Sequence, residues 1–117
     1  MNIVLLHGVL AREPDLRSLP SGDEVASFDI TVRDDGYDTE VVPVSWHDAP
    51  ITSLDKLEVG AEVIVTGRVR RRFFRAGGAT QSRTEVVAVA VVPTRQSRGA
   101  KKAIEAALVT GEEWLAG

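Results

Sequence analysis

The sequence predicts an all-β fold: a small five-stranded Greek-key barrel followed by a C-terminal helix. Short segments with apolar residues at alternate positions recur over the first 92 residues. One short helical segment separates the third strand from the fourth, and helical spacing returns only after Pro93. At 117 residues the chain is long enough for one core without covalent cross-links.

The first strand is expected over residues 2–10, where both faces are largely apolar. One face carries Val4, Leu6 and Leu10, and the other carries Ile3, Leu5 and His7. A strand of this kind is covered on both sides, so we expect the second face to contact another subunit. Residues 12–23 are rich in turn formers and predict a long loop.

The second and third strands are expected over residues 25–32 and 39–46. In the second, the inward residues are Ala26, Phe28, Ile30 and Val32; in the third, Val42, Val44 and Trp46 share a face. Asp48 is expected to cap a short helix that has Pro50 in its first turn and ends at Gly60. Leu54 and Leu57 of that helix would close the core.

The fourth strand is expected over residues 61–73, with Val63, Val65 and Val69 inward. A loop through Gly77 and Gly78 leads to a fifth strand at 83–92. We therefore divide the chain into a barrel at residues 1–93 and a linker with a helix at 94–117, in which Ile104 and Leu108 share one stripe.

Three strands, a short helix and two further strands follow the order of the OB-fold barrel, which binds oligonucleotides across one face. An SH3-like barrel is the alternative, and the helix between the third and fourth strands argues against it.

The most basic segment of the chain lies on the fourth strand and the loop after it. Residues 68–83 contain six arginines and no acid, although the whole chain has a net charge of −3 and residues 13–62 hold thirteen acids against three bases. Strand periodicity puts Arg68, Arg70, Arg72 and Phe74 on one face. Guanidinium groups beside an aromatic ring can hold phosphates and stack a base. The alternative is a solvated strand edge, which arginines protect from aggregation.

Composition excludes several other classes of protein. There is no cysteine, and two isolated histidines, His7 and His47, do not make a metal site. No segment has the length of a membrane span, and the N-terminus is interpreted as a strand and not a signal peptide. We find no recognisable catalytic or cofactor-binding arrangement, so we expect no enzyme, no cofactor and a cytoplasmic location.

Many short matches together resemble the bacterial single-stranded DNA-binding protein family over about residues 1–92. They include Asn2, Val4, Leu6, Gly8 and Leu10 at the start, Glu13-Pro14-Asp15, Ser21-Gly22, Gly67-Arg68-Val69-Arg70 and Thr84-Glu85-Val86-Val87. The resemblance implies an OB-fold homotetramer, a dimer of dimers, that wraps single-stranded DNA. It also implies a role in replication, recombination or repair, at the nucleoid and with other proteins of those processes.

The resemblance assigns roles to Phe74, Trp46 and the arginines of the fourth strand, and the residue pattern itself supplies the other candidates. Phe74 corresponds to a base-stacking tryptophan, and Trp46 lies near a stacking phenylalanine, although a buried tryptophan is an equal alternative at that position. Phe73 is expected to pack beneath the hairpin. The candidate phosphate contacts are Arg68, Arg70, Arg72, Arg75 and Arg83, with Arg12 and Arg17 from the first loop.

Two features depart from the family. Val41 stands where a stacking aromatic is usual, and a short helix ending in GEEWLAG replaces a long tail with an acidic tip. The sequence therefore predicts a largely sequence-independent binder of single-stranded DNA and leaves three alternatives open: a protein-interaction adaptor with weak DNA affinity, an RNA binder and a nuclease.

Overall fold

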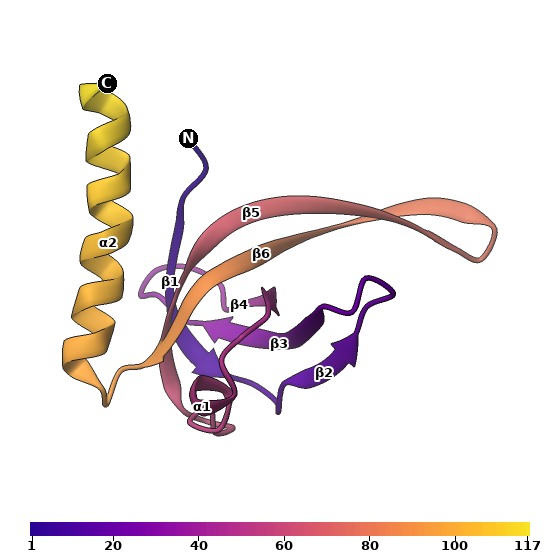
Figure 1. The fold of residues 1–117 in the computed structure, drawn as a ribbon, viewed down its shortest axis with the longest axis horizontal. Helices are drawn as coiled ribbons and strands as arrows, with labels where there is room; N and C mark the ends of the chain where they lie inside the picture. Colours follow the sequence, from indigo (N-terminus) through magenta and orange to yellow (C-terminus); the bar gives the residue numbers. More distant parts are fainter.

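A computed structural model describes all residues from 1 to 117, as six strands and two helices (Figure 1). The strands are β1 (Val4–Leu10), β2 (Asp15–Ser18), β3 (Glu24–Val32), β4 (Glu40–His47), β5 (Glu62–Ala76) and β6 (Ala79–Pro93). The helices are α1 (Ile51–Leu54) and α2 (Ser97–Ala116).

Five of the strands form a closed ring of pairings. The order is β1-β5-β6-β4-β3, and β3 pairs again with β1. All neighbours are antiparallel except β4 and β6, which are parallel. A closed five-stranded ring with α1 between the third and fourth of these strands is the predicted OB-fold architecture, so the fold class is confirmed.

The core lies inside this ring and follows the predicted alternation. Phe28 and Ile30 of β3, Val44 and Trp46 of β4, and Val63 and Val65 of β5 all belong to one buried cluster. Leu57, just after α1, is buried at the end of the barrel, and Leu54 packs against the cluster from the surface. Period-two side-chain alternation therefore predicted the core of these strands correctly.

Two expectations about the loops are wrong. Residues 12–23 contain β2, a four-residue strand that pairs with the start of β3. The helix expected from Asp48 to Gly60 is only the single turn of α1, and its N-cap residue is Pro50, which makes no side-chain capping bond. Asp48 has a positive φ of 51°, and its carboxylate accepts a hydrogen bond from the Glu24 N–H at 3.2 Å. It fixes the strand ends instead of starting the helix.

The β5–β6 hairpin is much longer than expected. The strands continue to Ala76 and restart at Ala79, so Gly77 and Gly78 alone make the turn, with φ of 60° and 79°. Two consecutive left-handed residues are the geometry of a tight hairpin turn, which glycine adopts without strain. In Figure 1 the hairpin extends as an arm beyond the rest of the barrel.

A bulge separates the barrel half of this hairpin from the arm. Thr66 pairs with Ala90 and Gly67 with Ala88, so Val89 is the extra residue and is 76% exposed. Gly67 is required here because a Cβ at this position would lie 2.1 Å from the Val87 carbonyl oxygen. Val69, expected in the core, pairs with buried Val86 but is itself exposed, because it lies where the arm leaves the barrel.

Helix α2 begins at Ser97, within the segment 94–117 that was expected to contain a linker and a helix, and packs against β1, β5 and β6. Small side chains allow the close approach: Ala100 is buried, and Ala103 and Ala107 line the seam with the sheet. Figure 1 shows the helix standing beside the barrel, with its C-terminus near the N-terminus of the chain.

Candidate nucleic-acid interface

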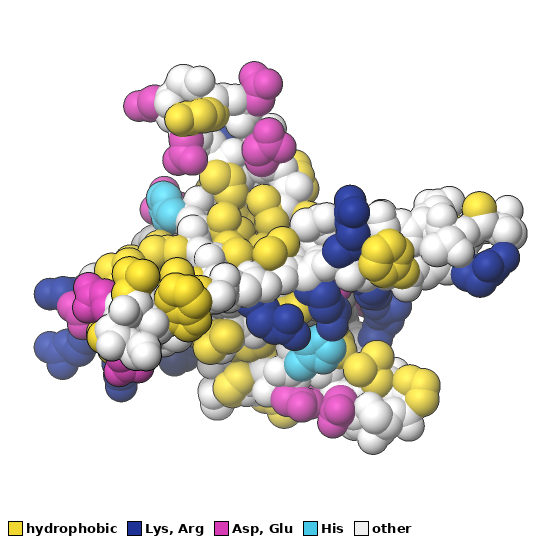
Figure 2. All heavy atoms as spheres, turned by 90° about the horizontal axis from the view of Figure 1, so that it is seen from above, with side chains coloured by type: hydrophobic (Ala, Val, Ile, Leu, Met, Phe, Trp, Pro, Cys, Tyr) yellow, Lys and Arg dark blue, Asp and Glu magenta, His cyan; other side chains and the backbone are white.

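A polar groove lies on the outer face of the barrel, between the arm and the β2–β3 hairpin. Its walls carry five arginines from four different parts of the chain: Arg12, Arg17, Arg70, Arg72 and Arg83. Its floor includes Ser27 and Ser45, which pair across β3 and β4. In Figure 2 dark-blue side chains gather where the arm leaves the barrel.

The strand register sets which arginines face this groove. Across the arm, Arg70 pairs with Glu85, Arg72 with Arg83, and Phe74 with Gln81. Because directly paired residues in an antiparallel ladder point to the same face, these side chains share one surface of the arm. Arg71, Phe73 and Arg75 alternate with them and point to the opposite surface.

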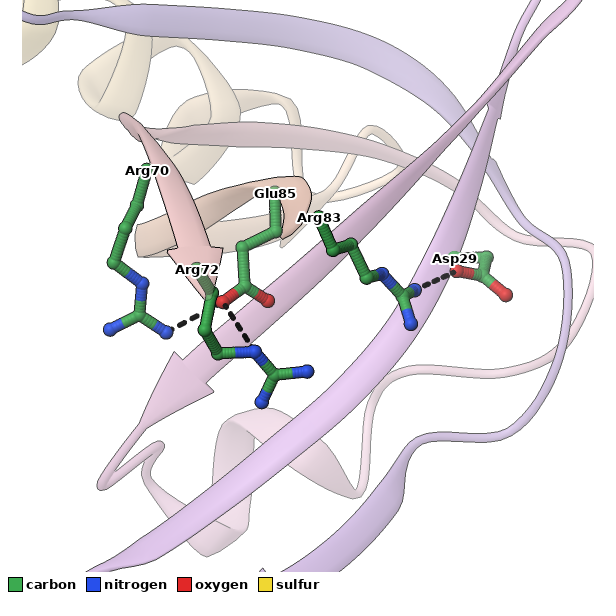
Figure 3. A network of polar contacts seen from close by, with 5 residues as sticks. All are labelled: Asp29, Arg70, Arg72, Arg83 and Glu85. Carbon is green, nitrogen blue, oxygen red and sulfur yellow. Dashed lines mark hydrogen bonds and ion pairs between the residues drawn. The ribbon is translucent and has the colours of Figure 1, made fainter. Parts of the chain in front are cut away.

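Two carboxylates hold four of these arginines in place, and Figure 3 shows three of them, Arg70, Arg72 and Arg83. Arg70 Nη2 donates to Glu85 Oε1 at 2.6 Å, and Arg72 Nε lies 3.9 Å from the same oxygen. Asp29 accepts from Arg12 Nε at 3.0 Å and lies 3.8 Å from Arg83 Nη2. Four cations against two anions leave an excess of positive charge on this cluster.

The two carboxylates differ in burial, which gives them different effects. The Glu85 side chain is 7% exposed, so water screens its attraction for Arg70 only weakly. The pairs of Asp29 are more exposed and contribute little to stability. Glu85 therefore orients the arginines of the arm, whereas Asp29 connects the arm to the first loop.

An aromatic ring, that of Phe74, lies beyond the groove on the same surface of the arm and beside one of these cations. The Arg72 guanidinium carbon is 5.7 Å from the centroid of the Phe74 ring, a cation–π distance. Phe74 is 37% exposed, so part of its ring faces solvent. Its surroundings offer a base a stacking surface next to a phosphate-binding group.

Two polar atoms of this region have no protein hydrogen-bond partner although they are buried: Ser45 Oγ and Arg70 Nε. A buried polar atom without a partner costs free energy, and a ligand reaches such an atom only when the side chains that cover it move. Both belong to residues that line the groove. Both atoms therefore lie beneath the surface of the groove and are not exposed within it.

The structure brings together most of the residues predicted as DNA contacts. Arg12, Arg17, Arg70, Arg72 and Arg83 line the groove, and Phe74 continues its surface along the arm. Arg68 does not join them, because it lines the cavity between α2 and the sheet. Arg75 lies on the opposite surface of the arm and donates to the Gly78 carbonyl oxygen at 2.9 Å.

Two expectations about aromatic residues are corrected. Trp46 is only 6% exposed and belongs to the core cluster, so neither face of its indole is open to a base. Phe73 does not pack beneath the hairpin; it is 66% exposed. The alternation of β4 put Trp46 inward with Val44, and the length of the arm carries Phe73 away from any packing partner.

Sequence reasoning missed four polar residues of the groove region. Ser45, His47 and Glu85 line it, and Asp29 binds two of its arginines. Asp29 alternates with the inward residues of β3, but no local pattern shows which distant arginines it meets. Glu85 was noticed only as part of a family match.

The residues expected at a subunit contact have the orientation that was predicted. Ile3, Leu5 and His7 are all exposed, whereas Leu6 and Leu10 turn toward the barrel.

None of the chain's helices has the length and apolar character needed to span a membrane. No group of three or more His, Asp or Glu side chains is placed to hold a metal ion.

Comparisons with known proteins agree with this architecture. The model of the single-strand binding protein family matches residues 1–94. A single-stranded DNA-binding protein of Oceanobacillus iheyensis is 34% identical over an alignment of 109 residues, and the match covers 85% of this chain and 68% of the relative.

A solved structure extends the comparison to three dimensions. It is the single-strand binding protein of Plasmodium falciparum in complex with single-stranded DNA, with a TM-score of 0.63 and 28% identity. The match covers 74% of this chain and 85% of that one. On its sequence, its fold and the match over four fifths of its length, the chain belongs to the single-strand binding protein family.

Proposed function

We propose that this protein binds single-stranded DNA, largely without regard to sequence, through the groove between the arm and the β2–β3 hairpin. One observation carries the proposal: five arginines and an exposed phenylalanine converge on the face that OB-folds use for oligonucleotides. Membership in a family of non-catalytic DNA-binding proteins agrees with the prediction that the protein is not an enzyme.

The arginines supply affinity by neutralising phosphates. Each phosphate that pairs with a guanidinium releases condensed counterions, so affinity falls as salt rises, with a log–log slope of roughly −0.7 per phosphate on a single strand. Glu85 and Asp29 hold four guanidinium groups in the groove before DNA arrives, which lowers the entropic cost of ordering them.

Phe74 supplies a second kind of contact. Stacking on an aromatic ring contributes about 1–3 kcal/mol per base and accepts any base, because every base has a π-face. The neighbouring Arg72 can pair with the phosphate of a stacked nucleotide. Charge and stacking together explain binding that does not depend on base sequence.

A titration with oligo(dT) at two salt concentrations tests this proposal. We expect binding that weakens steeply at the higher concentration, together with weaker binding of a DNA duplex of the same length. Matched DNA and RNA strands distinguish a DNA binder from an RNA binder, because base stacking tolerates either sugar. Undetectable binding, or affinity independent of salt, would remove the proposal.

We further propose that the protein acts as a homo-oligomer, a dimer of dimers, through the outer face of β1. Ile3 and Leu5 expose apolar surface on this strand, next to the exposed His7. Light scattering at micromolar concentration tests it: we expect a mass above that of one chain, and Leu5→Glu to lower it. A wild-type mass of one chain would contradict this.

The expected biological setting follows from the ligand. Single-stranded DNA is exposed during replication, recombination and repair, so we place the protein at the nucleoid, in the cytoplasm. A role as a protein-interaction adaptor remains the second candidate, favoured by Trp114 and Leu115, which are exposed beside Glu112 and Glu113 at the end of α2. Oligonucleotide affinity much weaker than that of the Oceanobacillus iheyensis relative would favour the adaptor.

A further inference from the structure

The arm is a two-stranded ribbon whose two surfaces are both uncovered. Every residue of β6 from Ala79 to Thr84 is exposed, as is each residue of β5 from Arg71 to Arg75. The groove described above uses only one surface, with Arg72, Arg83 and Phe74. The other surface carries Arg71, Phe73 and Arg75, which pair with Thr84, Ser82 and Thr80.

This second surface repeats the chemistry of the first. Phe73 lies between Arg71 and Arg75 at alternate positions of β5, whereas Phe74 has an arginine, Arg72, on one side only. Phe73 is more exposed than Phe74, 66% against 37%. Its ring is therefore the more accessible of the two stacking surfaces.

The charges of the second surface are less compensated than those of the groove. Residues 68–84 contain no acid, and neither Arg71 nor Arg75 forms an ion pair with a carboxylate. In the groove, by contrast, Arg70, Arg72 and Arg83 all approach Glu85 or Asp29. The single bond from Arg75 to the Gly78 carbonyl holds its side chain along the ribbon and leaves its charge unneutralised.

This combination of groups fits a polyanion with flat, apolar bases better than it fits a protein surface. A second copy of this chain would have to bury two like-charged guanidinium groups beside each Phe73, at a large desolvation cost. A nucleic-acid strand supplies phosphates for the arginines and a base for the ring. Figure 2 shows dark-blue atoms and a yellow ring on the arm, with open solvent around them.

We propose that Arg71, Phe73 and Arg75 form a second contact site for single-stranded DNA, and that one strand turns around the edge of the arm to occupy both surfaces. The inference rests on the proposed function, since it extends the path of the same ligand. A strand that fits within the groove uses the first surface only. A longer strand uses both.

Oligonucleotides of two lengths distinguish binding at the first surface from binding at both surfaces. The short probe is oligo(dT) of about eight nucleotides, within the site size of one OB-fold, and the long probe is roughly twice the upper limit of about 16. The second-surface variants are Phe73→Thr and Arg71→Thr, because threonine preserves the strand. Phe74→Thr serves as the matched variant of the groove, and Arg98→Thr, on exposed α2, controls for loss of one positive charge.

Phe73→Thr should leave affinity for the short probe within about twofold of wild type and weaken binding of the long probe about five- to 150-fold. Arg71→Thr should reduce the salt slope of the long probe alone, by roughly 0.7. Phe74→Thr should weaken the binding of both probes, and Arg98→Thr should weaken the binding of neither.

Each of the other outcomes shows which of the two proposals, the DNA-binding function or the second site, is wrong. If the wild type binds neither probe, the proposed function itself is wrong. If the wild type binds both and Phe73→Thr binds the long probe equally well, the second site is overturned while the groove stands. Equal losses on both probes, in a variant with an unchanged melting temperature, would likewise overturn a separate second site.

Discussion

Arg70 donates a 2.6 Å hydrogen bond to Glu85, the one carboxylate that is almost buried among the arginines of the groove. The pair joins β5 to β6 at the point where the barrel becomes the arm. An acid lowers the attraction of this surface for phosphate, so its presence needs a physical reason. It orients Arg70 and Arg72 toward the groove and offsets the repulsion between them.

Replacing this acid tests its orienting role. Glu85→Gln removes one negative charge and keeps a hydrogen-bond acceptor for Arg70. We expect the free energy of unfolding to fall by about 1–2 kcal/mol, because a charge-assisted bond becomes a neutral one. Affinity for oligo(dT) should rise, with a salt slope steeper by roughly 0.7 for one more phosphate contact. Chemical denaturation and a salt series of titrations measure the two effects.

A matched replacement on the same strand pair checks the interpretation. Gln81→Glu adds an acid opposite Phe74, where no arginine is paired with it. It should weaken DNA binding without the stability change seen at position 85. Reduced affinity of Glu85→Gln at every salt concentration would show that orientation of the arginines matters more than their net charge.

The arginines and the phenylalanine of the groove should differ in how salt affects their loss. Arg72→Ala should weaken binding and flatten the salt slope by roughly 0.7, since one fewer phosphate is neutralised. Phe74→Ala should weaken binding by about 1–3 kcal/mol and leave the slope nearly unchanged. Fluorescence anisotropy over a series of salt concentrations measures both. Identical slopes for the two variants would contradict separate charge and stacking roles.

The core of the barrel was predictable because its strands alternate over several residues. Phe28 and Ile30 could be placed from the pattern of β3 alone, and the face shared by Arg70, Arg72 and Phe74 followed from the same period. The extent of the arm was not predictable from the sequence. Residues 70–84 are polar or exposed on both surfaces, so they lack the alternation of apolar and polar residues that marks a buried face. Their strand conformation depends on cross-strand pairing through the Gly77-Gly78 turn.

The polar contacts of the groove could not be predicted from the sequence either. Asp29 meets Arg12 and Arg83, which lie 17 and 54 positions away in sequence, and such pairs arise only once the barrel closes. The short strand β2 was missed because four exposed residues, only one of them apolar, give no periodic pattern. Trp46 was ambiguous because its strand pattern favoured the core while the family resemblance favoured DNA. Its burial shows that the local pattern was the better guide.

Because Trp46 is buried, we expect substitutions at this position to lower stability without changing DNA affinity. Trp46→Ala should lower the free energy of unfolding by about 3–5 kcal/mol, as expected for a large aromatic residue removed from a core. Trp46→Phe should lower it less and keep oligo(dT) affinity at the wild-type value. Thermal melts and titrations of the folded variants measure both. Normal stability combined with weakened binding in Trp46→Phe would instead show that Trp46 contacts DNA.

The bulge at the base of the arm predicts opposite effects for the same substitution at two glycines. In Gly67→Ala the new methyl group would lie 2.1 Å from the Val87 carbonyl oxygen and 3.0 Å from the Ala88 Cα, both backbone atoms. The two strands must separate to admit it, which should cost about 1–3 kcal/mol of stability and misplace the arm. Affinity for oligo(dT) should fall as well, because Arg70 and Arg72 lie just beyond the bulge.

Gly111→Ala is the matched control. Gly111 lies inside α2, and its added methyl group would lie 3.5 Å from the Met1 sulfur, an ordinary van der Waals distance. Alanine is the better helix former by about 0.8–1.0 kcal/mol, so this variant should melt at a higher temperature and bind DNA as the wild type does. Scanning calorimetry compares the two variants directly. A Gly67→Ala protein as stable as the wild type would mean that the bulge can move along β6, and that the arm is not fixed to the barrel by the close approach of Gly67 to Val87.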